Sequence, residues 1–288
     1  MEGKVTMKFF KDILKGVVIG VANAIPGVSG GTMMVSMGVY DDIIFCITHL
    51  FKQLKKSIMI LLPYFIGMLI GIVGLAFSIK SLYANFPFQT SMVFIGLIIG
   101  GVPMLYEHVK KSSLKLTHIL LFILFLVSII AMQYFGGSGK DVVLSLDIIS
   151  IIKIFFIGIL ASATMVIPGV SGSMMMMILG YYNPIINAIT DFVTALAERD
   201  WNTMLNICGS LVPFGIGVVI GIFVIAKIIE ILLQKFEAHT YCAILGLVIS
   251  SPVVILMGTD MGNINIIAVL TGLACLVAGV FASRQLGK

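Results

Sequence analysis

The sequence predicts an all-α polytopic membrane protein made of two inverted-topology repeats, each a re-entrant helix hairpin plus three transmembrane helices. The 288-residue chain is 59% hydrophobic and only 11% charged, whereas soluble domains carry about 25% charged residues. Several stretches of about 20 residues contain no charge, which is long enough to cross the hydrocarbon core of a bilayer. A ten-residue motif also occurs twice, and the lysines gather in alternate predicted loops.

The repeated motif interrupts the hydrophobic pattern once in each half of the chain. Residues 25–34 and 167–176 are identical at eight of ten positions, at an offset of 142 residues. Both copies begin Ile-Pro-Gly-Val-Ser-Gly, in which proline removes a backbone donor and glycine allows a sharp turn. Such a break is tolerated at membrane depth only where protein or a watery cavity covers it. Two breaks in matching positions of two halves therefore predict a transport site.

The first repeat, residues 1–135, is predicted to begin with a re-entrant hairpin at about 8–50. Its half-helices cover 8–24 and 31–50, on either side of the break at Pro26. Basic residues both precede and follow this hairpin. Because cytoplasmic loops collect lysine, a hairpin that returns to the same side fits better than a crossing helix. Three apolar spans complete the repeat at about 58–79, 90–106 and 117–135.

The second repeat, residues 148–288, follows a polar linker at 136–147 and has the same plan. Its hairpin covers about 148–192, with half-helices at 148–165 and 173–192 around the break at Pro168, and its spans are predicted at about 204–226, 240–258 and 263–283. Ordered matches outside the motif indicate a duplication. At the offset of 142 they are Lys11 with Lys153, Gly16 with Gly158, Gly38 with Gly180 and Tyr40 with Tyr182. At an offset of 150 they are Pro63 with Pro213, Gly67 with Gly217, Gly71 with Gly221, Phe86 with Phe236 and Gly96-Leu97 with Gly246-Leu247.

Three crossings in each half would invert the second repeat relative to the first and leave both termini in the cytoplasm. The segments on the cytoplasmic side then hold 14 of the 18 basic residues, as the positive-inside rule requires. This distribution accounts for the net charge of +5 without a nucleic-acid partner. Outside lie Lys80, Lys140, Lys153 and Arg199, and inside lie Lys4, Lys8, Lys11, Lys15, Lys52, Lys55, Lys56, Lys110, Lys111, Lys115, Lys227, Lys235, Arg284 and Lys288.

The two breaks are predicted to bind an anion. Each return half-helix would begin near the bilayer middle with backbone N–H groups that lack intrahelical partners, at the positive end of its dipole. Ser29, Thr32, Ser171 and Ser173 add hydroxyl donors. Phosphate or a similar anion is therefore the expected guest. The competing interpretation is that the small residues only allow close helix packing.

The placement of basic residues favours a phosphate carried on a lipid. Both arginines of the chain lie in a predicted loop or tail, whereas a soluble dianion would be expected to meet a deep lysine or arginine. Lys11 and Lys153 are predicted near opposite membrane faces. Each could bind a headgroup on its own leaflet, or simply extend to the interface as lysines often do.

Other chemistry finds no support in the sequence. There is no nucleophile–base pair and no metal motif, so we predict no enzymatic activity, cofactor or metal. The four histidines are predicted to form no cluster. Asp41 and Asp42 lie about ten residues beyond the first break, near the cytoplasmic interface, and we expect no deep carboxylate suited to a proton relay.

Residues 23–32, Gly38-Val39-Tyr40 and residues 167–173 resemble the bacterial polyprenyl-phosphate transporters, a family of undecaprenyl-phosphate translocases. The resemblance covers most of the chain. It implies a bacterial cell-membrane protein with paired re-entrant segments, which returns undecaprenyl phosphate from the outer to the inner leaflet for reuse in cell-wall synthesis. An acidic residue often occupies the position of Asn23 in this family, so the amide here leaves open whether a proton or sodium is coupled to transport.

The predicted substrate is a polyprenyl-phosphate lipid, with membrane lipids around it. A transporter or channel for a small soluble anion and a membrane scaffold remain alternatives. The predicted substrate-binding residues combine the two motifs with the paired lysines: Asn23, Pro26, Gly27, Ser29, Gly30, Gly31, Thr32, Pro168, Gly169, Ser171, Gly172, Ser173, Lys11 and Lys153.

Overall fold

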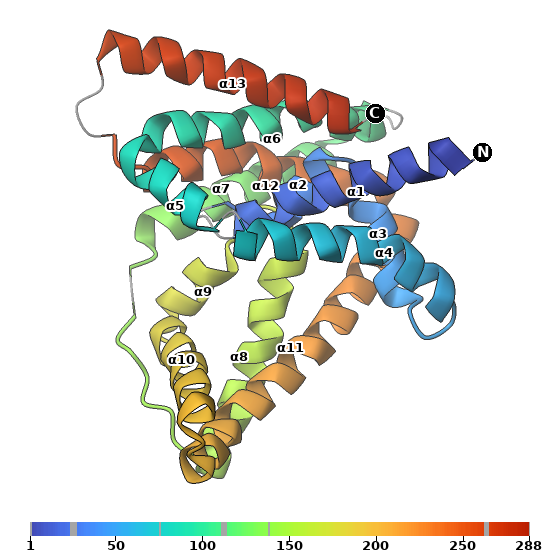
Figure 1. Ribbon diagram of the computed structural model, residues 1–288. Coiled ribbons are helices and arrows are strands. Elements are labelled where there is room, and N and C mark those ends of the chain that lie inside the picture. The colour runs from blue at the N-terminus through green and yellow to red at the C-terminus, as the bar shows by residue number, and fades with distance from the viewer. Residues whose placement is uncertain are drawn as a thin grey trace.

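The computed structural model describes residues 2–23, 28–74, 76–110, 114–137, 139–261 and 265–287. All regular secondary structure in these ranges is helical (Figure 1). The elements are α1 Glu2–Asn23, α2 Gly30–Ser36, α3 Tyr40–Thr48, α4 Leu54–Leu69, the π-helical turn η1 Ile70–Gly74, α5 Ala76–Asn85, α6 Pro87–Lys110, α7 Leu116–Phe135, α8 Ile148–Val166, α9 Gly172–Ile178, α10 Tyr182–Glu198, α11 Trp201–Lys235, α12 Glu237–Gly258 and α13 Ile266–Gly287.

Seven segments in the described part of the chain are long and apolar enough to cross a membrane. They are α4 with η1, α6, α7, α8, α11, α12 and α13. The prediction of an all-helical, multi-pass membrane protein is therefore confirmed. Each of the six predicted spans overlaps one of these segments. The segment that overlaps the span predicted at 58–79 ends five residues earlier, at Gly74, and α11 extends nine residues beyond the predicted end at 226.

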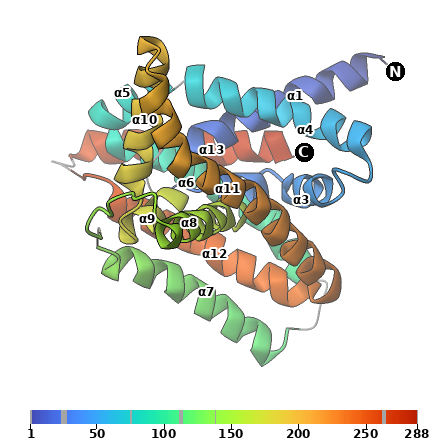
Figure 2. The same ribbon diagram turned by 90° about the horizontal axis from the view of Figure 1, so that it is seen from below.

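The helices form a broad layer and an arm that projects from it. In Figure 1, α1, α4, α6, α12 and α13 run across the upper part of the molecule, whereas α8, α10 and α11 converge at the bottom. Figure 2 shows α7 alongside α12 on one side of the molecule. Both ends of the chain lie at the same end of the layer.

Close glycine contacts join the main helix pairs. A Cβ atom added at Gly67 would lie 2.1 Å from the carbonyl oxygen of Ile13, so α4 packs directly on the backbone of α1. A Cβ atom added at Gly217 would lie 2.1 Å from the carbonyl oxygen of Phe155, which joins α11 to α8 in the same way. Small residues permit such approaches between membrane helices. The two pairs use residues that match at the offsets of the sequence repeat.

Gly217→Ala is expected to lower the thermal unfolding midpoint of the purified protein, because the new methyl group would force α8 and α11 apart. Overpacking of this kind costs about 1–3 kcal/mol. Gly215→Ala is the matched control on the same helix, since an added Cβ there meets no atom within 4 Å. Equal midpoints for the two variants would contradict the close packing of α8 on α11.

The return half-helices predicted at 31–50 and 173–192 are each broken in two. The first becomes α2 and α3, which are bent by 115°, and the second becomes α9 and α10. Gly38 and Gly180 follow α2 and α9 with φ of +65° and +73°, a conformation that glycine adopts without strain. The N–H groups of Val39 and Tyr181 then bond back to carbonyls of the preceding turn, as in a Schellman motif.

Candidate functional site

The two sequence breaks contact each other at the centre of the fold. A Cβ atom added at Gly31 would lie 3.2 Å from Cα of Pro168 and 3.3 Å from the carbonyl oxygen of Ile167. The Pro168 side chain is less than 2% exposed. A side chain at this position would require the second break to shift by a few tenths of an ångström or more. The structure thus brings together two motifs that are 142 residues apart in the sequence.

Thr32 links the two motifs by a hydrogen bond. The Gly169 N–H donates to Thr32 Oγ1 at 2.7 Å, and the Ser251 hydroxyl of α12 lies 3.5 Å from the same oxygen. Thr32 is 0% exposed, so this bond is shielded from water and costly to leave unmade. Gly169 has φ of +80°, and an added Cβ would lie 2.6 Å from the carbonyl oxygen of Leu247.

A second bond between the halves lies beside the first. The hydroxyl of Tyr40, at the start of α3, donates to the carbonyl oxygen of Val166 at 3.1 Å. Val166 is the last residue of α8, where helix carbonyls lack intrahelical partners. Both α2 and α3 therefore hold the second break.

The first motif is held by its own backbone and by Asn23. The Gly30 N–H donates to Asn23 Oδ1 at 3.2 Å, and an added Cβ at Gly30 would clash with that amide. Ser29 occupies the N-cap position of α2, but its side chain makes no capping bond. The predicted site residues Pro26 and Gly27 lie outside the described residues.

The second motif has a more complete cap. Ser171 Oγ accepts from the N–H of Met174 at 3.4 Å and lies 3.1 Å from the hydroxyl of Ser173. An added Cβ at Gly172 would lie 2.8 Å from Thr164 Oγ1. Both return helices are only seven residues long. The dipole of a long half-helix, expected from the sequence, is therefore reduced to that of a short turn.

The two motifs differ in how deeply they are buried. Six of the seven residues of α2 are buried, whereas α9 contains none. An added Cβ at Gly101 of α6 would lie 2.3 Å from Cα of Ser36, so α2 is packed firmly against α6. Helix α2 is thus enclosed by the layer, whereas α9 stands at the base of the arm with its residues partly open.

The paired lysines lie apart from the breaks. Lys11 on α1 and Lys153 on α8 are both exposed. Each lies about 12 or 13 residues before the end of its helix, or about 18–20 Å along the axis at 1.5 Å per residue. The structure therefore unites the described motif residues around Thr32 and Gly169, and it does not bring Lys11 or Lys153 to them.

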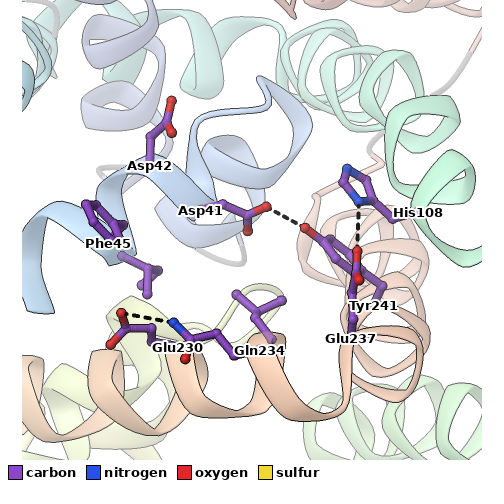
Figure 3. Close-up of a pocket in the computed structure, with 10 residues that line it drawn as sticks. Asp41, Asp42, Phe45, His108, Glu230, Gln234, Glu237 and Tyr241 are labelled. Atoms are coloured by element: carbon purple, nitrogen blue, oxygen red, sulfur yellow. Dashed lines mark hydrogen bonds and ion pairs between the residues drawn. The ribbon is translucent and has the colours of Figure 1, made fainter.

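Sequence reasoning missed an acidic cavity of about 400 Å³ (Figure 3). The Tyr241 hydroxyl bonds Asp41 there, and Tyr241 also stacks on His108 with ring centroids 4.3 Å apart. Four helices contribute, so no local sequence pattern marks the site. The charged and polar lining residues are Asp41 and Asp42 from α3, His108 from α6, Glu230 and Gln234 from α11, and Glu237 and Tyr241 from α12.

Helix packing brings several ionisable residues together or buries them. Histidines do meet, since the rings of His118 and His239 lie 4.1 Å apart. Carboxylates are also buried: Asp12 is 8% exposed and accepts a bond from the Tyr64 hydroxyl at 2.9 Å. Glu230 is 5% exposed and pairs with Lys227 at 2.6 Å. The partner of Asp12 is distant in sequence, whereas Lys227 lies three residues before Glu230 on α11. Among the described residues, no group of three or more His, Cys, Asp or Glu is arranged to hold a metal.

Comparison with known proteins identifies the family. Residues 19–268 match the family described as VCA0040-like, undecaprenyl phosphate translocase-like. The chain belongs to this family. The resemblance seen in the two motifs is thereby confirmed, and both motifs lie within the matched region of this undecaprenyl phosphate translocase-like protein.

Two curated relatives, both named polyprenyl-phosphate transporter, match most of the chain. The polyprenyl-phosphate transporter of Staphylococcus aureus (strain NCTC 8325 / PS 47) is 31% identical over 290 residues, which covers 98% of each chain. The polyprenyl-phosphate transporter of Vibrio cholerae serotype O1 (strain ATCC 39315 / El Tor Inaba N16961) is 27% identical over 266 residues, covering 87% of this chain and 78% of that one. No solved structure matches the chain.

Proposed function

We propose that this protein transports polyprenyl phosphate across the bacterial cell membrane, from the outer to the inner leaflet, so that the carrier lipid is reused in cell-wall synthesis. Family membership and the names of the two relatives support the substrate. The observation that carries the proposal is the contact of the two breaks through Gly31, Thr32 and Gly169. In this proposal the lipid headgroup would have to pass the buried junction between the two repeated motifs.

In this proposal the phosphate passes between the breaks while the polyprenyl tail stays in lipid. Parting of Thr32 from Gly169 would free a hydroxyl and a backbone N–H, both of which can donate to phosphate. Neither group carries charge, so the site would release the headgroup as well as bind it. The proposed contacts are the motif residues Asn23, Pro26, Gly27, Ser29, Gly30, Gly31, Thr32, Pro168, Gly169, Ser171, Gly172 and Ser173.

We further propose that residues 1–135 and 148–288 are inverted repeats, each with a re-entrant hairpin, and that both termini are cytoplasmic. The equivalent glycine contacts of α1 with α4 and of α8 with α11 support the duplication. Cysteines introduced at Lys55 and Lys140 should then react with impermeant reagents from the inside and the outside, respectively. Labelling of position 55 from outside would contradict the re-entrant hairpin.

Binding of the lipid to purified protein tests the proposed substrate. Undecaprenyl phosphate should bind and be displaced by short-chain polyprenyl phosphates, but not by inorganic phosphate, because the tail contributes to affinity. Displacement by inorganic phosphate at equal concentration would instead favour a carrier for a small soluble anion. If undecaprenyl phosphate does not bind at all, the alternative of a membrane scaffold would be favoured.

Lys11 and Lys153 are proposed to collect headgroups on opposite leaflets. Lys153→Gln should slow transport of lipid supplied in the outer leaflet, and Lys11→Gln transport of lipid supplied in the inner one. Both lysines are exposed, so we expect about a two- to fivefold effect that shrinks with added salt. Initial rates with lipid in one leaflet at a time provide the measurement. Equal slowing from both leaflets, or none, would contradict this role.

A further inference from the structure

A second cavity opens where the last turns of α6 and α13 meet the end of α2, and we call it the α6–α13 cavity. Its volume is about 520 Å³. It is lined by Ser36 of α2, by Gly101 and Glu107 of α6, and by Ser283 and Arg284 of α13, among others. Helices α6 and α13 lie side by side, and this end of the pair is also where the chain ends (Figure 1).

Ser36 lines the α6–α13 cavity and carries a buried polar side chain. Its side chain is 1% exposed, and its Oγ has no hydrogen-bond partner within the described ranges. The hydroxyl of Ser283 donates to the Ser36 carbonyl oxygen at 3.4 Å, so it does not satisfy that Oγ. Buried hydroxyls are nearly always paired. An occupant of the cavity that accepts a hydrogen bond would provide the missing partner.

Arg284 provides positive charge at the same place. It is exposed and forms no ion pair or hydrogen bond with any described residue. Its guanidinium can hold two phosphate oxygens at once. The neighbouring acidic cavity has the opposite character, because four carboxylates and no lysine or arginine line it. Of these two cavities, only the α6–α13 cavity suits a phosphate.

We propose that the α6–α13 cavity binds the phosphate of a lipid headgroup, which pairs with Arg284 and accepts a hydrogen bond from Ser36 Oγ. The lipid chain would leave beside Phe281, whose side chain is 64% exposed. A membrane phospholipid and polyprenyl phosphate both carry the required group. The proposal that the cavity binds a lipid phosphate is independent of the proposed function. Only the statement that this lipid is the transported polyprenyl phosphate rests on it.

Helix α2 connects this cavity with the junction of the two breaks. Ser36 is its last residue, and Thr32 lies one turn earlier, about 6 Å along the axis. A headgroup in the α6–α13 cavity therefore touches the same short helix that closes the breaks. Binding there would add a contact to the packing that already holds α2 against α6.

Lipid titrations of the purified full-length protein, read by native mass spectrometry, test the proposal. The probes are undecaprenyl phosphate, phosphatidylglycerol and inorganic phosphate. Arg284→Gln should weaken retention of at least one of the two lipids about fivefold. The matched control is Arg199→Gln, which removes the only other arginine of the chain and should change nothing. Glu107→Gln should strengthen retention, because it removes a negative charge from the cavity wall.

Ser36→Ala separates binding from folding. It should weaken retention about two- to threefold, while the thermal midpoint stays unchanged or rises because a buried hydroxyl without a described partner is removed. Unchanged retention in both Arg284→Gln and Ser36→Ala would overturn the proposal. Arginine-dependent binding of inorganic phosphate, with no effect on either lipid, would overturn the assignment to a lipid.

The lipid probes also separate this inference from the proposed function. Suppose that retention of phosphatidylglycerol depends on Arg284 while undecaprenyl phosphate is neither bound nor transported. The cavity assignment then stands and the proposed function fails. If undecaprenyl phosphate is transported and both lipids bind the Arg284→Gln variant normally, the proposed function stands and the cavity assignment fails.

Discussion

Gly31→Leu is expected to abolish transport while the protein still reaches the membrane. Even a Cβ atom at this position would lie 3.2 Å from Cα of Pro168, so a leucine must push the two breaks apart. Gly31→Ala should retain part of the activity, because its single methyl group needs a shift of only a few tenths of an ångström. The measurement is the initial rate of lipid transport in proteoliposomes, normalised to inserted protein.

Gly137→Leu is the control for added bulk. Gly137 lies between the halves, and a Cβ atom there meets nothing within 4 Å. Its rate should equal that of the unmodified protein. Full activity of Gly31→Leu, with the protein folded and inserted, would contradict a role for the junction in transport.

Thr32→Val is expected to reduce transport about tenfold or more. Valine keeps the shape of threonine but removes the oxygen that accepts from the Gly169 N–H. An unsatisfied buried donor costs about 1–3 kcal/mol, and the proposed phosphate contact is lost as well. Thr32→Ser retains the hydroxyl and should keep most of the activity. Equal rates for the valine and serine variants would show that the bond between the motifs is not needed.

Local sequence signals predicted the helices and the breaks because hydrophobic length and proline position are properties of short segments. The bend after α2 was missed, although Gly38 and Gly180 were matched as repeat partners, because a pattern of apolar residues does not reveal which glycine adopts a positive φ. The meeting of Thr32 with Gly169 could be anticipated only in outline, from the repeat. Its geometry depends on how α8 and α2 pack.

The acidic cavity could not be predicted from the sequence at all. Asp41, Glu230 and Tyr241 come from three helices, and each alone resembles an ordinary residue near a span end. Burial of Asp12 likewise depends on Tyr64, which is 52 residues away. Such contacts depend on how the helices pack, and the hydropathy of a single segment does not predict that packing.

Transport itself is tested most directly by a leaflet assay in sealed proteoliposomes. Undecaprenyl phosphate carrying a label at its headgroup is placed in the outer leaflet, and its loss of access to an impermeant reagent is followed with time. We expect the unmodified protein to make the label inaccessible much faster than protein-free vesicles, and the Gly31→Leu variant to match the protein-free rate. Equal rates for unmodified protein and empty vesicles would contradict the proposed transport of polyprenyl phosphate.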